Sequence, residues 1–100
     1  MNQRILNVDQ RRLAELCQLH GIRRLAVFGS ATRDELGPDS DIDLLVEFIP
    51  GQEPGLEFIA IQDELSSLVG REVDLNTPGF LSRHFRDRVT AEAIPIYEAA

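Results

Sequence analysis

The sequence predicts an α/β fold in which a small mixed β-sheet of three to four strands is covered by helices. Helix-like and strand-like segments alternate along the 100 residues, which favours a sheet with helices packed on it. The segment 41–48 also places apolar residues at every second position, as a half-buried strand requires. A chain of this length is expected to form one domain over residues 1–100, with a core of modest size.

The first part of the chain is expected to form a helix, a strand and a second, shorter helix. Asp9 can cap a helix that runs to about His20, and Gly21 suits the position just after its end. A short apolar strand is predicted over residues 24–28. Ser30 can then open a short helix that reaches Leu36.

The next predicted strand runs from Asp41 to Phe48 or Ile49 and has one apolar and one acidic face. Side chains two residues apart in a strand point to the same side, so Ile42 and the alternate apolar residues after it should face the core. Glu47 is on the acidic face, and we expect it to be solvated and too far along the strand to share a site with Asp41.

Three further elements are predicted after the loop over residues 50–55. A helix over residues 56–69 should bury a stripe that contains Leu56, Ile59, Leu65 and Leu68, and Gly70 should end it. A strand over residues 72–75 should point Val73 and Leu75 inward and Asp74 to the opposite face. Thr77 and Pro78 should open the last helix, with Leu81, Phe85 and Val89 as its core face, before an edge strand over residues 93–97 that contains Pro95.

Composition and charge exclude several classes of function. The net charge is -7, which argues against DNA or RNA binding by the chain itself and against an anionic membrane surface. Cys17 is the only cysteine, so no internal disulfide can form; we expect it in the core of a cytoplasmic protein. His20 and His84 are expected on helix surfaces. No apolar stretch approaches the length needed to cross a bilayer.

Asp41 and Asp43 form the first candidate site, because they occupy the same face of one strand. Two carboxylates about 6 Å apart repel each other by about 3 kcal/mol at an effective dielectric constant near 20. A hard divalent cation such as Mg²⁺ would turn that repulsion into a binding site, and it prefers one or two carboxylates together with substrate phosphates. The alternative is a pair of strand-entry residues next to a turn.

Gly29 and Ser30 form the second candidate site, at the end of the preceding strand. Glycine allows a phosphate to approach the backbone closely, and the first N–H groups of a following helix favour anions. Arg33 lies one helical turn after Ser30 and could reach the same phosphates; it could equally be an exposed arginine. Taken alone, the Gly-Ser pair is only a turn followed by a helix cap.

Together these motifs resemble a known signature. Gly29-Ser30, ten intervening residues, Asp41-Ile42-Asp43 and the later Asp74 are similar to the pattern of the DNA polymerase β-type nucleotidyltransferase superfamily. The small size and layout resemble its minimal nucleotidyltransferases, many of which are paired with helical HEPN proteins. The resemblance implies the polymerase β palm-like nucleotidyltransferase fold.

The resemblance also implies roles for the site residues. Asp41, Asp43 and Asp74 would bind magnesium, as a two-ion site, and act as the catalytic carboxylates. Gly29, Ser30 and Arg33 would bind the triphosphate of ATP or another nucleoside triphosphate.

The implied activity is transfer of a nucleoside monophosphate, AMP from ATP, to a hydroxyl of a protein partner. The chain would thus be the antitoxin of a HEPN-type toxin. The alternative is a non-catalytic protein-binding antitoxin with a vestigial nucleotide site. Transfer to a small-molecule hydroxyl is a third reading, and self-association into a homo-oligomer stays open.

Overall fold

The computed structural model describes residues 8–29, 41–80 and 83–99. The four strands of its sheet are ordered β3-β2-β1-β4. In chain order they are β1 (Ile22–Phe28), β2 (Ile42–Phe48), β3 (Val73–Asn76) and β4 (Ile94–Glu98). β1 is antiparallel to both of its neighbours, whereas β2 and β3 are parallel. The predicted small mixed sheet is therefore confirmed.

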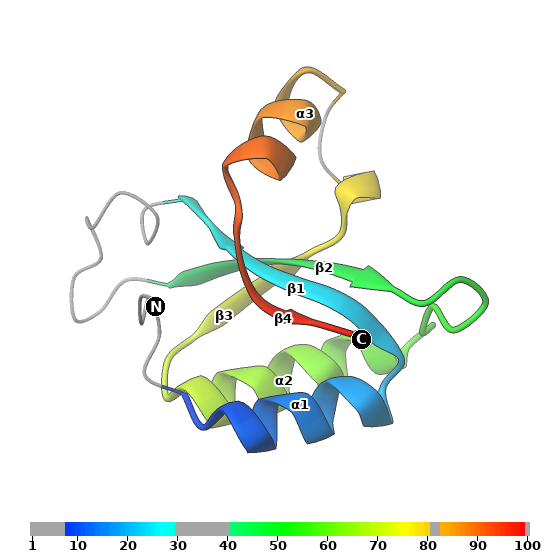
Figure 1. The fold of residues 1–100 in the computed structure, drawn as a ribbon, viewed down its shortest axis with the longest axis vertical. Coiled ribbons are helices and arrows are strands. Elements are labelled where there is room, and N and C mark those ends of the chain that lie inside the picture. The colour runs from blue at the N-terminus through cyan, green and yellow to red at the C-terminus, as the bar shows by residue number, and fades with distance from the viewer. Residues whose placement is uncertain (1–7, 30–40, 81–82, 100) are drawn as a thin grey trace.

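The helices lie on opposite sides of this sheet (Figure 1). α1 (Gln10–Leu19) and α2 (Glu57–Val69) run side by side across one face, and α3 (Arg83–Glu92) lies on the other side after a 3₁₀ turn, η2 (Pro78–Phe80). α1 begins where the sequence predicts, because the Asp9 carboxylate accepts hydrogen bonds from the N–H groups of Arg11 and Arg12 at 3.0 and 3.3 Å. α2 ends at Gly70, whose φ of 81° is left-handed.

Apolar side chains are buried on both faces of the two central strands. The larger cluster joins β1, β2 and β3 to Leu13 and Cys17 of α1 and to Ile61 and Leu65 of α2. The smaller cluster occupies the other face and contains Ala26, Phe28, Leu45, Val89 and Ala93. Because successive side chains of a strand alternate between faces, the residues on either side of Leu45 belong to the larger cluster, whereas Asp43 and Glu47 share the face of Leu45.

The predicted apolar stripe of α2 is wrong in part. Leu56 and Ile59 are 96% and 62% exposed, whereas Ile61 and Leu65 are fully buried. Residues two apart on a helix differ by roughly 200° in direction, so Ile59 and Ile61 cannot face the same layer. Several apolar residues are available near the start of α2, and the periodicity alone selected Leu56 and Ile59 instead of Ile61.

Other predictions need smaller corrections. β1 begins two residues before the predicted strand, at Ile22, and the last helix starts at Arg83 because residues 78–80 form the 3₁₀ turn. His20 is not a free surface residue, since its side chain is largely buried and its Nε2 lies 3.1 Å from Oε1 of Glu64. Cys17 is in the core and β4 is an edge strand, as predicted. No helix within the described ranges is long and apolar enough to cross a membrane.

Candidate active site

Asp43 and Asp74 lie beside each other on neighbouring strands. The parallel register of β2 and β3 makes them direct partners. Val73 and Leu75 are buried under the helical layer, so Asp74 points to the opposite face, which Asp43 also occupies. Strands are about 4.8 Å apart, so the two side chains start from adjacent backbone positions. The sequence predicts these residues separately, and the register brings them together.

Gly29 lies directly against the Asp43 side chain. It follows the end of β1, and its neighbour Phe28 is the cross-strand partner of Asp43. A Cβ atom built on Gly29 would be 2.5 Å from Oδ2 of Asp43, and the φ of Gly29 is 78°. Both observations require glycine at this position. The sequence predicts a close approach of Gly29 to a phosphate, but it does not predict this contact with the carboxylate.

The surroundings of Asp43 disfavour the ionised form of its carboxylate. Partial burial raises its pKa, and the negative charges of Asp74 and Asp41 raise the pKa further. Among the described residues, no ion pair includes any of these three aspartates. A bound cation would therefore relieve both the burial and the repulsion.

The donor set fits Mg²⁺ bound jointly with a substrate. Within the part of the chain that the structure describes, no group of three Asp, Glu, His or Cys side chains is placed to hold a metal ion. Mg²⁺ does not need such a group, because it commonly takes one or two carboxylates and completes its octahedron with phosphate oxygens and water. Asp43 and Asp74 could supply those carboxylates, with the exposed Asp41 at the entrance to β2.

Two predicted site residues, Ser30 and Arg33, lie outside the described residues, as does the predicted short helix that begins at Ser30. Their roles in phosphate binding stay predictions.

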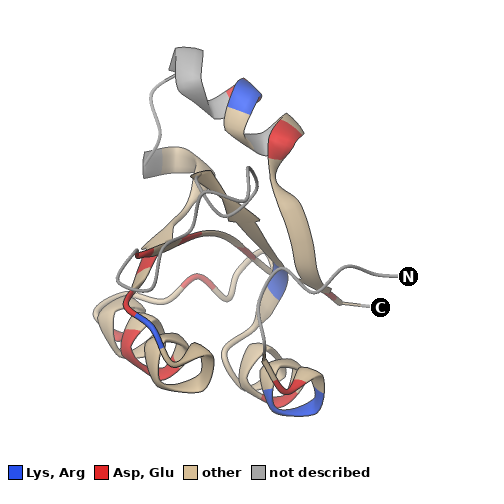
Figure 2. Cartoon of the chain, turned by 90° about the vertical axis from the view of Figure 1, so that its left-hand side faces the viewer, with Lys and Arg blue, Asp and Glu red and all other residues tan. Residues whose placement is uncertain are grey.

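Figure 2 views the molecule from the side of Figure 1 on which β2 begins, and acidic residues are visible there on strands as well as on helices.

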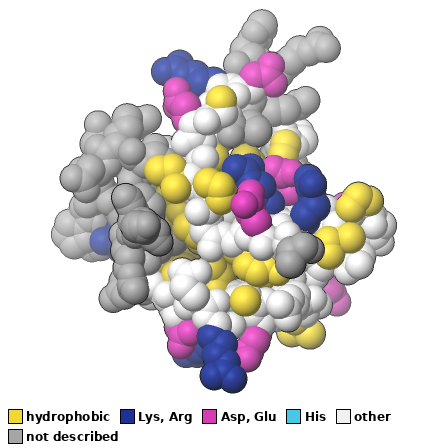
Figure 3. All heavy atoms as spheres, in the orientation of Figure 1, with side chains coloured by type: hydrophobic (Ala, Val, Ile, Leu, Met, Phe, Trp, Pro, Cys, Tyr) yellow, Lys and Arg dark blue, Asp and Glu magenta, His cyan; other side chains and the backbone are white. Residues whose placement is uncertain are grey.

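The prediction that Glu47 is solvated is wrong. Its carboxylate is bound by Arg23 at 2.6 Å and by Arg24 at 3.2 Å, and Arg24 also contacts Glu98 at 3.3 Å. Figure 3 shows basic and acidic side chains gathered near the middle of the molecular surface that faces the viewer, over the strands of the sheet. The arginines neutralise Glu47, so it is separate from the aspartate site. The sequence holds little local signal for these ion pairs, because Arg23 and Arg24 reach Glu47 only through the pairing of β1 with β2.

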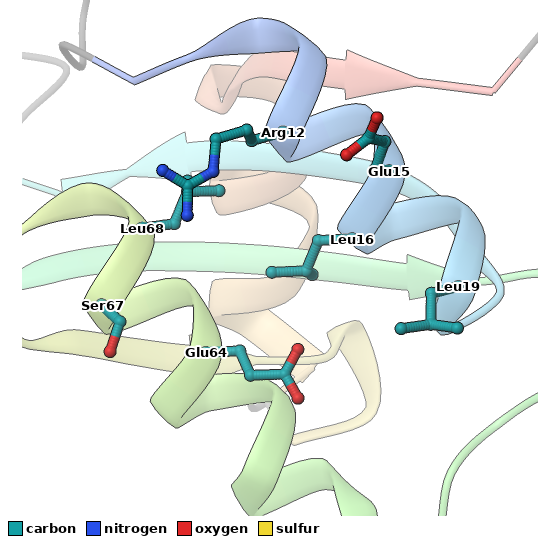
Figure 4. Close-up of a pocket in the computed structure, with 7 residues that line it drawn as sticks. All are labelled: Arg12, Glu15, Leu16, Leu19, Glu64, Ser67 and Leu68. Atoms are coloured by element: carbon teal, nitrogen blue, oxygen red, sulfur yellow. The ribbon is translucent and has the colours of Figure 1, made fainter.

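Two cavities lie away from the aspartates. One of about 410 Å³ lies between α1 and α2, where Leu16 and Leu68 line it together with Arg12 and Glu64 (Figure 4). Another of about 610 Å³ surrounds Phe48 and the start of α2. The aspartates line neither cavity, so the candidate site is defined by the strand register.

Comparison with solved structures defines the class of fold. One solved structure, provisionally described as a minimal nucleotidyltransferase, matches this chain with a TM-score of 0.73. The two sequences are 38% identical, and the match covers 87% of this chain and 88% of that one. A toxin–antitoxin structure with AMP-PNP matches with a TM-score of 0.72 at 17% identity, over 92% of this chain and 75% of that one. The antitoxin–HEPN toxin complex of Shewanella oneidensis, whose toxin is described as tri-AMPylated, matches with a TM-score of 0.63 at 16% identity, over 90% and 70%. The last two show likeness of fold only. The fold is that of nucleotidyltransferases.

Sequence comparison gives the family. The family described as nucleotidyltransferase domain matches residues 10–97. A protein of Methanocaldococcus jannaschii, provisionally named as a protein adenylyltransferase, is 34% identical over 91% of this chain and 97% of its own length. The protein adenylyltransferase MntA of Thermococcus cleftensis is 38% identical over 80% of each chain. The chain belongs to the nucleotidyltransferase domain family and is similar to minimal nucleotidyltransferases, which confirms the resemblance and the enzyme class predicted from the motifs.

Proposed function

We propose that this chain is a cytoplasmic, Mg²⁺-dependent protein adenylyltransferase that transfers AMP from ATP to a hydroxyl group of a HEPN-type toxin and so acts as its antitoxin. The observation that carries the proposal is the pairing of Asp43 with Asp74 beside Gly29. The names of the relatives support transfer to a protein. The toxin–antitoxin complexes that share its fold support the choice of partner. The proposal treats residues 1–100 as one catalytic domain.

Each site residue has a proposed role. Asp41, Asp43 and Asp74 would hold the metal, which supplies positive charge to the triphosphate and to the attacking oxygen. Gly29, Ser30 and Arg33 would orient the triphosphate so that its α-phosphorus faces the acceptor.

The bond changes follow from that orientation. The acceptor hydroxyl oxygen forms a bond to the α-phosphorus, and its proton passes to the Asp74 carboxylate. The bond between the α-phosphorus and the oxygen that bridges to the β-phosphate breaks, and pyrophosphate leaves. Positioning and charge stabilisation carry most of the catalysis in such reactions.

The test is transfer of label from α-³²P-ATP to a HEPN-type protein encoded beside this chain. We expect label on the partner with Mg²⁺ and none after chelation with EDTA. Asp43→Asn should abolish transfer, whereas Asp63→Asn, which removes an exposed carboxylate from α2, should leave it unchanged. Toxin inhibition in cells is measured with the same variants.

The outcomes separate enzyme from binding module. Loss of both transfer and toxin inhibition in Asp43→Asn supports the enzyme. Full toxin inhibition by Asp43→Asn, with no label transferred by the wild type, would establish a non-catalytic antitoxin and overturn the proposal.

A further inference from the structure

The strand that carries Asp74 is at the edge of the sheet and is held there by side chains of α2. β3 has four residues and pairs with β2 on one side only. On its other side, the N–H of Val73 donates to Oγ of Ser66 at 3.0 Å, and the N–H of Leu75 donates to Oε1 of Gln62 at 2.9 Å. The two acceptors take the place of a fifth strand.

These two hydrogen bonds flank Asp74 on either side. In a strand, successive residues direct their backbone groups to opposite edges, so Val73 and Leu75 turn outward to α2 while Asp74 turns inward to β2. The inner edge is also fastened, since the N–H of Ile42 donates to the carbonyl oxygen of Glu72 at 2.9 Å. The backbone around Asp74 is therefore held from both edges, at Val73 and Leu75 on the outer edge and at Glu72 on the inner edge.

The acceptors are themselves oriented by the helix. Gln62 and Ser66 are four residues apart and face the same side of α2, and both are half-buried. The hydroxyl of Ser66 donates to the carbonyl oxygen of Gln62 at 3.0 Å, which leaves its lone pairs directed at Val73. Apolar packing of Val73 and Leu75 sets the depth of β3, but packing alone is not directional and allows sliding along the strand.

We propose that Gln62 and Ser66 are positioning residues that fix the Asp74 carboxylate in register with Asp43 for binding of a divalent cation with a nucleoside triphosphate. The inference rests on the proposed function and extends it to two α2 residues that touch neither substrate nor metal. Outer-shell partners of metal ligands typically contribute 10- to 100-fold to metal affinity or activity.

The experiment uses Mn²⁺ as a spectroscopic probe in place of Mg²⁺. Gln62→Met removes the acceptor at similar side-chain length, and Ser66→Ala removes the hydroxyl. Ser66→Thr keeps a hydroxyl, and Ser67→Ala removes an exposed hydroxyl from the same helix. The Mn²⁺ affinity in the presence of ATP is measured by electron paramagnetic resonance, well below the melting temperature of each variant.

We expect the Mn²⁺ affinity to fall about tenfold or more in Gln62→Met and in Ser66→Ala, and to stay within about twofold of wild type in Ser66→Thr and Ser67→Ala. A second readout needs no metal. Amide hydrogen exchange should accelerate at Leu75 in Gln62→Met and at Val73 in Ser66→Ala, because each N–H loses its acceptor.

Leu68→Ala controls for general destabilisation, because Leu68 packs on the core from the same helix and makes no hydrogen bond to β3 among the described contacts. An equal loss of Mn²⁺ affinity in Leu68→Ala would reduce Gln62 and Ser66 to a structural role. The inference would be overturned, and the proposed function would stand, if the Gln62→Met/Ser66→Ala double variant bound Mn²⁺ with wild-type affinity while Asp74→Asn bound it more weakly. No Mn²⁺ binding by the wild type with ATP would instead overturn the proposed function, and the inference with it.

Discussion

Replacement of Gly29 by alanine tests the geometry of the site most directly. The Cβ atom of an alanine at this position would be 2.5 Å from Oδ2 and 3.3 Å from Cγ of Asp43. The backbone φ of 78° is also in the region that L-residues rarely adopt. Gly29→Ala should therefore destabilise the fold and displace the Asp43 carboxylate.

The two effects can be given separate magnitudes. A left-handed conformation costs an alanine about 1–2 kcal/mol. The clash requires Asp43 to leave its rotamer, which costs about 0.5–1.5 kcal/mol. The sum is about 1.5–3.5 kcal/mol in free energy of unfolding. In a domain of about 100 residues, 1 kcal/mol lowers the melting temperature by about 4–8 °C.

Gly70 provides the matched control. Its φ is 81°, and a Cβ atom built on it meets nothing within 4 Å. Gly70→Ala should therefore show the backbone effect alone, about 1–2 kcal/mol, with AMP transfer unchanged. Urea unfolding at equilibrium measures both variants, and the transfer assay shows whether Asp43 has moved.

A double-mutant cycle with Asp43→Ala isolates the contact. A truncated Asp43 leaves only its Cβ, 3.5 Å from the new methyl group, which is an ordinary contact distance. The excess destabilisation of Gly29→Ala, about 1 kcal/mol, should then disappear. If Gly29→Ala is no more destabilising than Gly70→Ala and transfers AMP at the wild-type rate, the described contact between Gly29 and Asp43 is refuted.

Three further predictions follow from burial and charge. Asp43→Asn should raise the free energy of unfolding at pH 7, because the raised pKa of Asp43 in the folded chain means that its ionised carboxylate destabilises the fold. The gain should vanish below about pH 3.9, where Asp43 is protonated in the unfolded chain as well. A lower free energy of unfolding for Asp43→Asn at pH 7 would contradict this prediction. Ile61→Ala should cost about 2–5 kcal/mol and Ile59→Ala within about 0.5 kcal/mol, in urea unfolding; equal costs would contradict the described face of α2. Burial raises the pKa of the Cys17 thiol to about 12, so a thiol reagent at pH 8 should modify it only as fast as the chain unfolds, whereas immediate native-state labelling would refute its burial.

The elements with strong local signals were predictable from the sequence. Asp9 and Gly70 mark helix ends by chemistry that acts within a few residues, a carboxylate that accepts N–H groups and a glycine that tolerates positive φ. The alternation around Leu44 likewise predicts which side of β2 joins the larger core cluster, although Leu45 on the other side is also buried. In these cases the structure follows from short-range rules.

Features that depend on tertiary packing were not predictable in the same way. Ile59 and Ile61 are equally apolar, and only contact with the sheet selects Ile61. Glu47 appears solvated in the sequence because the arginines that bind it come from another strand. The support of β3 by Gln62 and Ser66 has no local signal either, since both look like ordinary polar residues of a helix.

The Asp43–Asp74 pair shows how an unfavourable arrangement indicates function. Neighbouring strands are about 4.8 Å apart, and two unit charges at about that separation repel by on the order of 3 kcal/mol at an effective dielectric constant of 20. Solvent reduces this repulsion because Asp74 is exposed. Small domains are stable by only about 5–15 kcal/mol, so even the screened repulsion is a sizeable fraction. The described ion pairs could have supplied an arginine here, yet Arg23 and Arg24 bind Glu47. Among the residues that the structure describes, no ion pair includes Asp43 or Asp74, and such an uncompensated pair of carboxylates suits a cation that is bound jointly with substrate phosphates.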